Sequence, residues 1–192
     1  MKAKTLLVVS DDKIVNLLFS NFVSDDNIIL VKDKSSSLKR IIKLIRKGSL
    51  PILAVLKMAI AEFMRPNSKP QLQFLVIKSS SELLSLYDKY LPERIILFRA
   101  GLIVKRDQFP QELELLNVHC ASLPAYGGLA SIYRALNNGD YNQKATLHRV
   151  TNVIDGGEVL NELPYQMEPS NSYRRNEDIA YETGYELLLS IL

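Results

Sequence analysis

Short apolar runs alternate with helical patterns along the chain, and this alternation constrains the fold more than any other feature of the sequence. The runs expected to form strands are Leu6–Val9, Asn27–Val31, Gln73–Ile77, Arg94–Phe98, Leu115–Val118 and Ala145–Val150. Helical spacing occurs at Lys13–Val23, Ser81–Tyr90, Leu129–Leu136 and from about Asn176 to the end. Largely apolar strands separated by helices are typical of parallel sheets that are covered on both faces. The pattern therefore predicts an α/β fold with a doubly wound, mostly parallel sheet.

Length and composition indicate an ordinary globular protein. The chain has 192 residues, of which 47% are hydrophobic and 23% are charged, so residues 1–192 are expected to form a single domain. A net charge of +3 is too small to indicate nucleic-acid binding. The chain has one cysteine, Cys120, which excludes an internal disulfide and favours a reducing compartment.

The apolar segments are too short to serve as a secretion signal or a membrane span. The run Leu6–Val9 is followed at once by Ser10, Asp11 and Asp12. The longest apolar stretch, Leu50–Met64, is interrupted by Lys57 and is shorter than the roughly 20 apolar residues that a spanning helix needs. We therefore expect a soluble, cytoplasmic protein with no membrane span.

The segment between the second and third predicted strands contains two further helical stretches. Leu38–Lys47 places Leu38, Ile41, Ile42 and Ile45 on one face, with five basic residues largely elsewhere: Lys39, Arg40, Lys43, Arg46 and Lys47. The stretch is either a packed helix with a solvated basic face, or a basic surface that meets a phosphorylated substrate or an anionic membrane. Pro51–Met64 is apolar on nearly all sides, which favours a buried helix or one that partly covers a pocket.

Two polar segments follow the last predicted strands. Asn117 and His119 flank Val118 at a strand end, so both side chains are expected on the same side of the sheet. Asp155 follows an apolar strand and precedes two glycines, which permit close approach of the backbone to a ligand. Ligands of parallel sheets bind beyond the carboxyl ends of the strands, where these residues are expected to lie.

An Asn, a His and an Asp that lie together are suited to acyl transfer. An amide N–H stabilises an oxyanion, a histidine moves a proton near neutral pH, and a carboxylate orients that histidine and raises its pKa. The alternative is that Asn117 and His119 are structural, since the pattern alone does not place Asp155 beside His119.

The motifs around these residues resemble a known family. Asn117-Val-His119 followed by Ser122-Leu-Pro-Ala-Tyr-Gly-Gly128 resembles the Asn-x-His, Leu-Pro and Gly signature of the 10-formyltetrahydrofolate-dependent formyltransferases. Thr146–Val150 with Ile154-Asp-Gly-Gly157 resembles the second signature of that family, and the 36 positions between His119 and Asp155 suit it. The resemblance is specific over about Arg94–Leu163 and diffuse before that. It implies a Rossmann-like formyltransferase core.

The resemblance implies roles for individual residues. Asn117 would hydrogen-bond the formyl oxygen, His119 would assist proton transfer, and Asp155 would orient His119 or a water. The co-substrate would be 10-formyltetrahydrofolate, with no metal. Its pocket would be formed by the loop Phe98, Arg99, Ala100, Gly101, Leu102, Ile103 and Val104, and by Val153, Ile154 and Gly156. Tyr126, Gly127 and Gly128 would contact the acceptor.

Several positions depart from the family pattern or take ordinary roles. Cys120, Ala121 and Gly127 stand where members of the family commonly have Pro, Ser and Arg. A Cys120 nucleophile is disfavoured, because consecutive residues of an extended segment point to opposite faces. His148 is interpreted as a structural histidine, although the family commonly has His there.

The acceptor is inferred by elimination within the resembled family. The glycinamide ribonucleotide branch has a Gly-Ser-Asn phosphate loop where this chain has Ser10-Asp-Asp12. The methionyl-tRNA branch and the hydrolase branch carry added domains, whereas this sequence ends near the core's last helix. The resemblance therefore favours the small nucleotide-sugar N-formyltransferases of surface polysaccharide synthesis, some of which form homodimers. The alternatives are another small amine such as glycinamide ribonucleotide, or a non-catalytic binding subunit.

Overall fold

A seven-stranded sheet forms the centre of the computed structural model, which describes residues 5–23, 25–36 and 38–192. The strands are β1 (Thr5–Ser10), β2 (Ile28–Asp33), β3 (Leu75–Ile77), β4 (Arg94–Phe98), β5 (Glu114–His119), β6 (Asn142–Arg149) and β7 (Val159–Gln166). Their order across the sheet is β3-β2-β1-β4-β5-β6-β7. The first five strands are parallel, whereas β6 is antiparallel to both β5 and β7. The predicted α/β class and mostly parallel sheet are confirmed.

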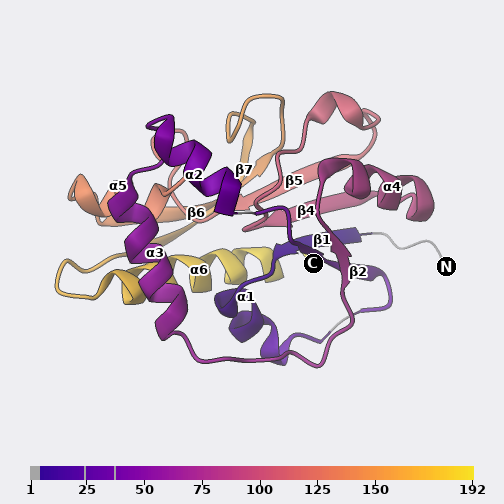
Figure 1. Cartoon of the computed structure of the whole chain (residues 1–192). Coiled ribbons are helices and arrows are strands. Elements are labelled where there is room, and N and C mark those ends of the chain that lie inside the picture. Colours follow the sequence, from indigo (N-terminus) through magenta and orange to yellow (C-terminus); the bar gives the residue numbers. More distant parts are fainter. Residues whose placement is uncertain (1–4, 24, 37) are drawn as a thin grey trace.

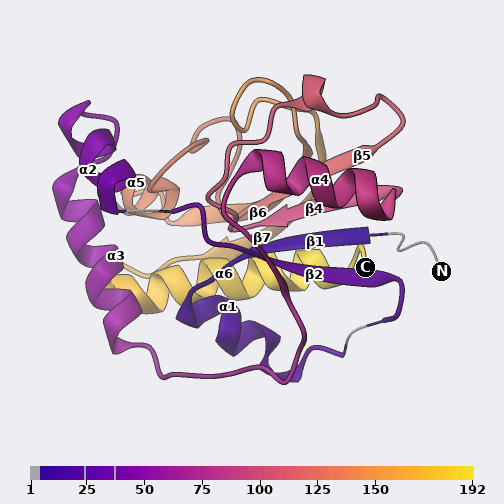
Figure 2. The same cartoon turned by 45° about the vertical axis from the view of Figure 1, so that its right-hand side comes forward.

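Helices cover both faces of the sheet. They are α1 (Lys13–Leu18), α2 (Leu38–Arg46), α3 (Ile52–Met64), α4 (Ser80–Tyr90), α5 (Ser131–Asn137) and α6 (Tyr173–Leu189). Figures 1 and 2 show α1 and α6 on one side of the sheet and α4 on the other. None of the helices in the described ranges is long and apolar enough to cross a membrane.

The alternation of side chains along β1 produces two cores. Leu7 and Val9 pack with α1, α5 and α6 on one face, and Leu6 and Val8 pack with α4 on the other. All four side chains are fully buried, so the run is apolar at every position. This explains why β1 has the continuous apolar pattern of a central parallel strand.

The strand boundaries differ from the predicted ones mainly at the far edge. β7 was not among the predicted strands, because Val159, Leu160 and Asn161 are exposed and give only a short apolar signal. Its polar residues are tolerated because β7 is an edge strand with one face toward solvent. The predicted helix Lys13–Val23 is shorter, and α1 ends at Leu18 before a 3₁₀ turn at Phe19–Asn21.

Two expectations for residues 38–64 require correction. Ile42 is exposed and lines an outer hollow, whereas Ile41 lines a cavity, so the predicted apolar residues do not share one buried face; the side chain of Leu38 lies outside the described part of the chain. The prediction of a fully buried helix at 51–64 is also wrong, because α3 buries only Ala54 and Ala61 completely. The alternative prediction, a helix that partly covers a pocket, agrees with the position of α3 over a cavity. A purely apolar sequence cannot show which face of a helix has a partner.

Candidate active site

The end of β5 presents Asn117 and His119 on the same side of the sheet. Val118 and Cys120 point to the opposite side, where they belong to the core formed with α6. This arrangement follows from the two-residue period of a strand. In the adjacent strands, Asn117 lies opposite Leu97 of β4 and His148 of β6.

Asp155 brings this polar cluster together from the loop after β6. Its Oδ2 accepts a hydrogen bond from the backbone N–H of Gly128 at 2.7 Å and lies 3.4 Å from His119 Nδ1. Its Oδ1 lies 3.3 Å from Asn117 Nδ2. Asp155 has a left-handed φ of 50°, an uncommon conformation for a residue with a side chain. A β-carbon at Gly127 would lie 3.3 Å from that of Asp155, so this glycine leaves room for the carboxylate.

His148 is a fourth member of the cluster, in addition to its predicted structural role. It is buried, and its Nε2 lies 2.9 Å from Asn117 Nδ2 and 3.4 Å from Asp155 Oδ1. Its Nδ1 lies 3.0 Å from the carbonyl of Arg149, which can only accept, so Nδ1 carries a proton. Asn117 Nδ2 can only donate, so His148 Nε2 accepts the hydrogen bond between them. The antiparallel register of β5 and β6 creates this contact, and the spacing of the residues in sequence gives no signal for it.

The tautomer of His119 is set in the same way. Its Nε2 lies 2.9 Å from the carbonyl of Tyr126 and therefore donates to it. In the neutral ring, Nδ1 is then the unprotonated nitrogen, and it faces Asp155. A proton taken up by His119 is held at Nδ1 beside a carboxylate.

The pKa values of His119 and Asp155 favour a neutral base beside an ionised acid. Burial lowers the pKa of His119 below its ordinary value and outweighs the opposing effect of Asp155. The sequence predicted that a carboxylate would raise the pKa of His119. Asp155 does raise it, but burial lowers it by more, so the pKa of His119 is lowered in total. Burial opposes ionisation of Asp155, but the contact with His148, the positive charge that His119 carries when it is protonated, and the backbone N–H of Gly128 favour the carboxylate and lower its pKa to about 2.

Cys120 lies on the opposite side of the sheet from this cluster. Its thiol is buried against Gly184 of α6, and burial raises its pKa to about 12. The nucleophile is the thiolate, which is absent near neutral pH at such a pKa.

The residues predicted to form a folate pocket lie in two segments, one after β4 and one after β6. Phe98 ends β4 and residues 99–104 follow it, whereas residues 150–158 follow β6; Asn152 of the second loop contacts Asp107, which lies in a 3₁₀ turn (Arg106–Gln108) just after the first loop. Ile103, Val153 and Ile154 are more than half exposed, so they offer apolar surface. Phe98, Leu102 and Val104 are buried in the cores.

The backbone and one side chain of the 98–104 loop are already engaged. The N–H groups of Gly101 and Leu102 both donate to Asp33 Oδ2 of β2, at 2.6 and 2.8 Å. Arg99 pairs with Asp12 at 2.7 Å and lies over the ring of Tyr181. Burial opposes the charge of Arg99, but Asp12 raises its pKa well above the usual value.

Asp12 itself occupies the amino terminus of α1. It is the N-cap of that helix, and its carboxylate accepts from the backbone N–H of Val15. The Asp12–Arg99 pair joins residues that follow the adjacent parallel strands β1 and β4. Their charges at neighbouring strand ends are a signal that sequence analysis could have used, because such ends meet at one edge of a parallel sheet.

A cavity of about 350 Å³ is lined by residues of α2, α3, α6 and neighbouring loops, and the residues that line it do not include Asn117, His119, His148 or Asp155. Leu129 and Ala130, which directly follow Gly128, are among the lining residues. Apolar residues of α2 and α3 and their connection form much of its wall: Ile41, Leu44, Leu50, Val55, Met58 and Ala59. The polar residues that line it are Asp12, Ser36, Arg40, Glu62, Arg65, Arg99 and Glu177.

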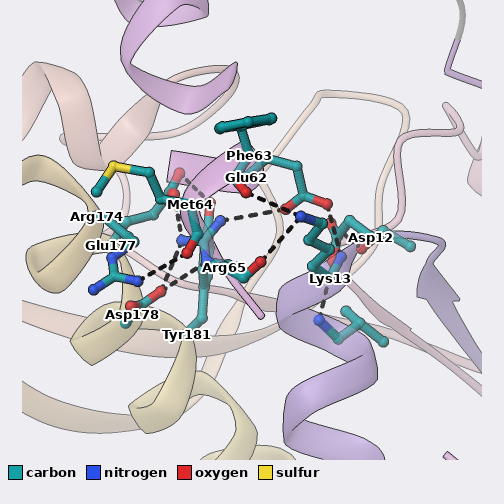
Figure 3. Close-up of polar contacts among 12 residues, drawn as sticks. Asp12, Lys13, Glu62, Phe63, Met64, Arg65, Arg174, Glu177, Asp178 and Tyr181 are labelled. Carbon is teal, nitrogen blue, oxygen red and sulfur yellow. Dashed lines mark hydrogen bonds and ion pairs between the residues drawn. The ribbon is translucent and has the colours of Figure 1, made fainter. Parts of the chain in front are cut away.

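Arg65 connects α3 to α6 at this cavity. Its guanidinium lies 2.6 Å from Glu177, 2.8 Å from Asp178 and 3.4 Å from Glu62 (Figure 3). Arg65 and Glu177 are buried, so this pair is shielded from solvent, whereas Glu62 is partly exposed. Lys13 adds a second connection, because its ammonium donates to the carbonyls of Phe63 and Arg65 at the end of α3.

The three residues predicted to contact the acceptor, Tyr126, Gly127 and Gly128, have different surroundings. Gly127 and Gly128 lie beside Asp155, and Gly128 is adjacent to the cavity residue Leu129. The Tyr126 side chain is buried in the core, whereas its carbonyl contacts His119. Of the basic residues of 39–47, Arg40 lines the cavity, and the others line a shallow hollow on the outside of α2: Lys39, Lys43, Arg46 and Lys47.

The sheet and the Asn–His–Asp cluster together define an α/β protein with a site suited to acyl transfer. A model of the formyl transferase family matches residues 27–192, so the chain belongs to this family.

Individual relatives differ in their acceptors. The chain is 28% identical over 132 residues to a methionyl-tRNA formyltransferase of Francisella tularensis, covering 66% of this chain but only 41% of that protein. It is 25% identical over 172 residues to phosphoribosylglycinamide formyltransferase of Haemophilus influenzae, covering 83% and 81%. An N-formyltransferase of Helicobacter canadensis, solved with folinic acid and dTDP-3-aminofucose, has the same fold, with a TM-score of 0.62, 17% identity and coverage of 99% and 62%.

Proposed function

We propose that this chain transfers a formyl group from 10-formyltetrahydrofolate to a primary amine, and that the amine belongs to a nucleotide-linked amino sugar. The observation that carries the proposal is the contact of Asp155 with both Asn117 and His119. Membership in the formyl transferase family supports the reaction.

The geometry suggests how the residues act. The acceptor nitrogen attacks the formyl carbon, and the carbonyl oxygen becomes an oxyanion that accepts a hydrogen bond from Asn117. That bond replaces the longer of the two contacts of Asn117 Nδ2, the one to Asp155 at 3.3 Å. His119 is neutral and takes the amine proton at Nδ1, where Asp155 stabilises the resulting charge.

Collapse of the tetrahedral species completes the reaction. The bond between the formyl carbon and N10 of the folate breaks, and that nitrogen leaves with a proton, giving the formamide and tetrahydrofolate. His119 supplies this proton, so the base of the first step is the acid of the second. The exposed apolar residues Ile103, Val153 and Ile154 fit the role of a surface for the folate ring.

The preference for a sugar nucleotide over glycinamide ribonucleotide is based on Asp12. Its carboxylate caps α1, so it takes the position at the helix terminus where a phosphate would otherwise be favoured. The largely apolar wall formed by α2 and α3 leaves space for a bulky body, and Arg40 offers a cation to a diphosphate. The Helicobacter canadensis enzyme, with its bound dTDP-amino sugar, is a precedent for this acceptor class.

A direct assay tests the reaction and the acceptor. The protein is mixed with 10-formyltetrahydrofolate and, in separate reactions, dTDP-linked, UDP-linked and GDP-linked amino sugars, glycinamide ribonucleotide or methionyl-tRNA, and tetrahydrofolate is measured. We expect turnover with a nucleotide-linked amino sugar. Turnover with glycinamide ribonucleotide alone would contradict the acceptor, and absence of both turnover and folate binding would indicate a non-catalytic subunit.

Variants test the assigned roles. Asn117→Ala and Asp155→Ala should each lower kcat by about two orders of magnitude or more. Asn67→Ala, at an exposed site after α3, is the matched control and should keep the wild-type rate. Arg40→Glu should raise the KM of the acceptor, whereas Lys47→Glu on the outside of α2 should not. An unchanged KM in Arg40→Glu removes this residue from acceptor binding.

A further inference from the structure

Helix α3 has an exposed apolar stripe along its whole length. Six large apolar side chains form it, and each is at least half exposed: Ile52, Leu53, Leu56, Ile60, Phe63 and Met64. Phe63 is the most exposed of them, at 83%. Their spacing places them on one continuous side of the helix. Contiguous exposed apolar surface of this kind marks an interaction site.

The stripe faces away from the body of the protein. Val55, Met58 and Ala59 lie on the other side of α3, where they line the cavity. Helix α2 is oriented in the same way, since Ile41 and Leu44 line the cavity. The opposite sides of both helices therefore turn outward. Figures 1 and 2 both show α2 and α3 at the edge of the molecule that is remote from the two termini.

Cations are concentrated in the part of the sequence that carries the stripe, and the one acidic residue of α3, Glu62, pairs with Arg65 and lines the cavity. Residues 34–61 contain seven of the 24 Lys and Arg residues of the chain and none of its 21 Asp and Glu residues. The remaining 17 basic residues are outnumbered by the acidic ones, so positive charge is concentrated here. On the outward side of α2, four of these cations and the exposed Ile42 line a shallow open hollow: Lys39, Lys43, Arg46 and Lys47.

We propose that this outer face of α2 and α3, formed by the six apolar residues of the stripe and the four cations of the hollow, docks on an anionic lipid surface. Apolar side chains beside a row of Lys and Arg are the combination by which helices lie in a membrane interface. The apolar stripe enters the boundary between headgroups and acyl chains, and the hollow of α2 receives phosphate headgroups. Neither helix crosses the bilayer.

The charge distribution favours a lipid surface over other occupants. A second copy of the chain would present the same excess of cations, so a contact of this face with itself offers no complementary charge. An acidic protein would need a groove shaped to receive the outward side of α3, and anions at fixed positions opposite the cations of α2. Lipids adjust to both, because individual headgroups move to each cation. The proposal is independent of the proposed formyl transfer, since no member of the catalytic cluster takes part.

Sedimentation with vesicles tests the proposal. The full chain is mixed with vesicles of phosphatidylglycerol and phosphatidylcholine in equal parts, or with vesicles of phosphatidylcholine alone. We expect the protein to sediment with the anionic vesicles at low salt, to bind the neutral ones about tenfold less, and to be released as the salt concentration rises. Equal binding to both vesicles, or binding to neither, overturns the proposal.

Two sets of variants separate the apolar from the charged contribution. Leu56→Gln/Phe63→Gln and, separately, Lys43→Glu/Lys47→Glu should each reduce binding to anionic vesicles by about tenfold or more. Leu189→Gln and Lys78→Glu, at exposed sites outside α2 and α3, are the matched controls and should bind as the wild type does. All substituted side chains are exposed, so the fold should persist, and circular dichroism checks this. A dimer that Leu56→Gln/Phe63→Gln dissociates, without vesicle binding by the wild type, would instead assign the face to a second copy.

Discussion

Arg65 and Glu177 lie 112 positions apart in the sequence, and their side chains approach to 2.6 Å in a buried ion pair. Arg65 ends α3 and Glu177 lies in α6, so the pair attaches the helix that covers the cavity to the helix that covers the sheet. Asp178 adds a second carboxylate at 2.8 Å.

Loss of Arg65 should therefore destabilise the protein strongly. Arg65→Met leaves Glu177 buried without its ion-pair partner, which costs about 3–5 kcal/mol of unfolding free energy. The measurement is urea denaturation. Glu177→Gln added to Arg65→Met should recover part of the loss, because the buried negative charge is removed. Lys144→Met breaks the exposed pair with Glu162 and is the control, with an expected loss below about 1 kcal/mol.

Gly184 should not tolerate a methyl group, although it lies inside a helix. A β-carbon there would lie 2.5 Å from Cys120 Sγ and 3.2 Å from Phe98 Cε2. Overpacking of this kind costs about 1–3 kcal/mol, which exceeds the gain of up to about 1 kcal/mol from better helix propensity. Gly184→Ala should therefore lower the Tm in a thermal melt. Cys120→Ala should restore stability in the Gly184→Ala background, and a melt unchanged by Gly184→Ala would contradict the close contact.

His148 should position Asn117 without touching the substrates. His148→Gln removes or displaces the hydrogen bond between the two side chains, which contributes about 1 kcal/mol, so kcat should fall by up to about tenfold. The KM for 10-formyltetrahydrofolate should stay near its wild-type value, because His148 acts only through Asn117. A purely structural defect would instead alter both kcat and KM. Steady-state kinetics with the acceptor at saturation provide the measurement. A wild-type kcat would show that Asn117 is held by other contacts.

The acid limb of the activity profile should report His119. Its pKa is lowered by burial, so activity should fall only at a pH below its ordinary value of 6.5. Asp155, with a pKa of about 2, stays ionised throughout this range and adds no inflection. The measurement is the pH dependence of kcat/KM, and an acid limb above about pH 7 would contradict the burial of a neutral His119.

The same shift predicts a dependence of stability on pH. The unfolded chain binds a proton at His119 more readily than the folded protein does, so acidification through this range favours unfolding. The contribution of His119 to stability is therefore complete above its unfolded pKa and declines as the pH falls toward its folded pKa. His119→Gln should reduce the loss of unfolding free energy between about pH 7.5 and about pH 5.5. An identical loss in the variant would assign the pH dependence to other groups.

The sequence by itself determined the class of sheet and the polar residues at its edge. Continuous apolar runs such as Leu6–Val9 are compatible with few environments other than a strand buried on both faces, so local pattern was sufficient. The positions of Asn117 and His119 on one side of β5 also follow from the period of a strand, which is a local property. The β7 edge strand was missed because its exposed residues give little apolar signal.

Only the tertiary structure decided which of these residues meet. His148 joins the polar cluster because of the register of β5 against β6. Asp12 and Arg99 form their ion pair because β1 and β4 are adjacent in the sheet. The lowered pKa of His119 depends on its burial, which a sequence pattern does not report. The apolar sequence of α3 was compatible with complete burial, and only the arrangement of its neighbours left one side exposed. Contacts between distant segments are set by packing of the whole chain, whereas sequence periodicity describes one element at a time.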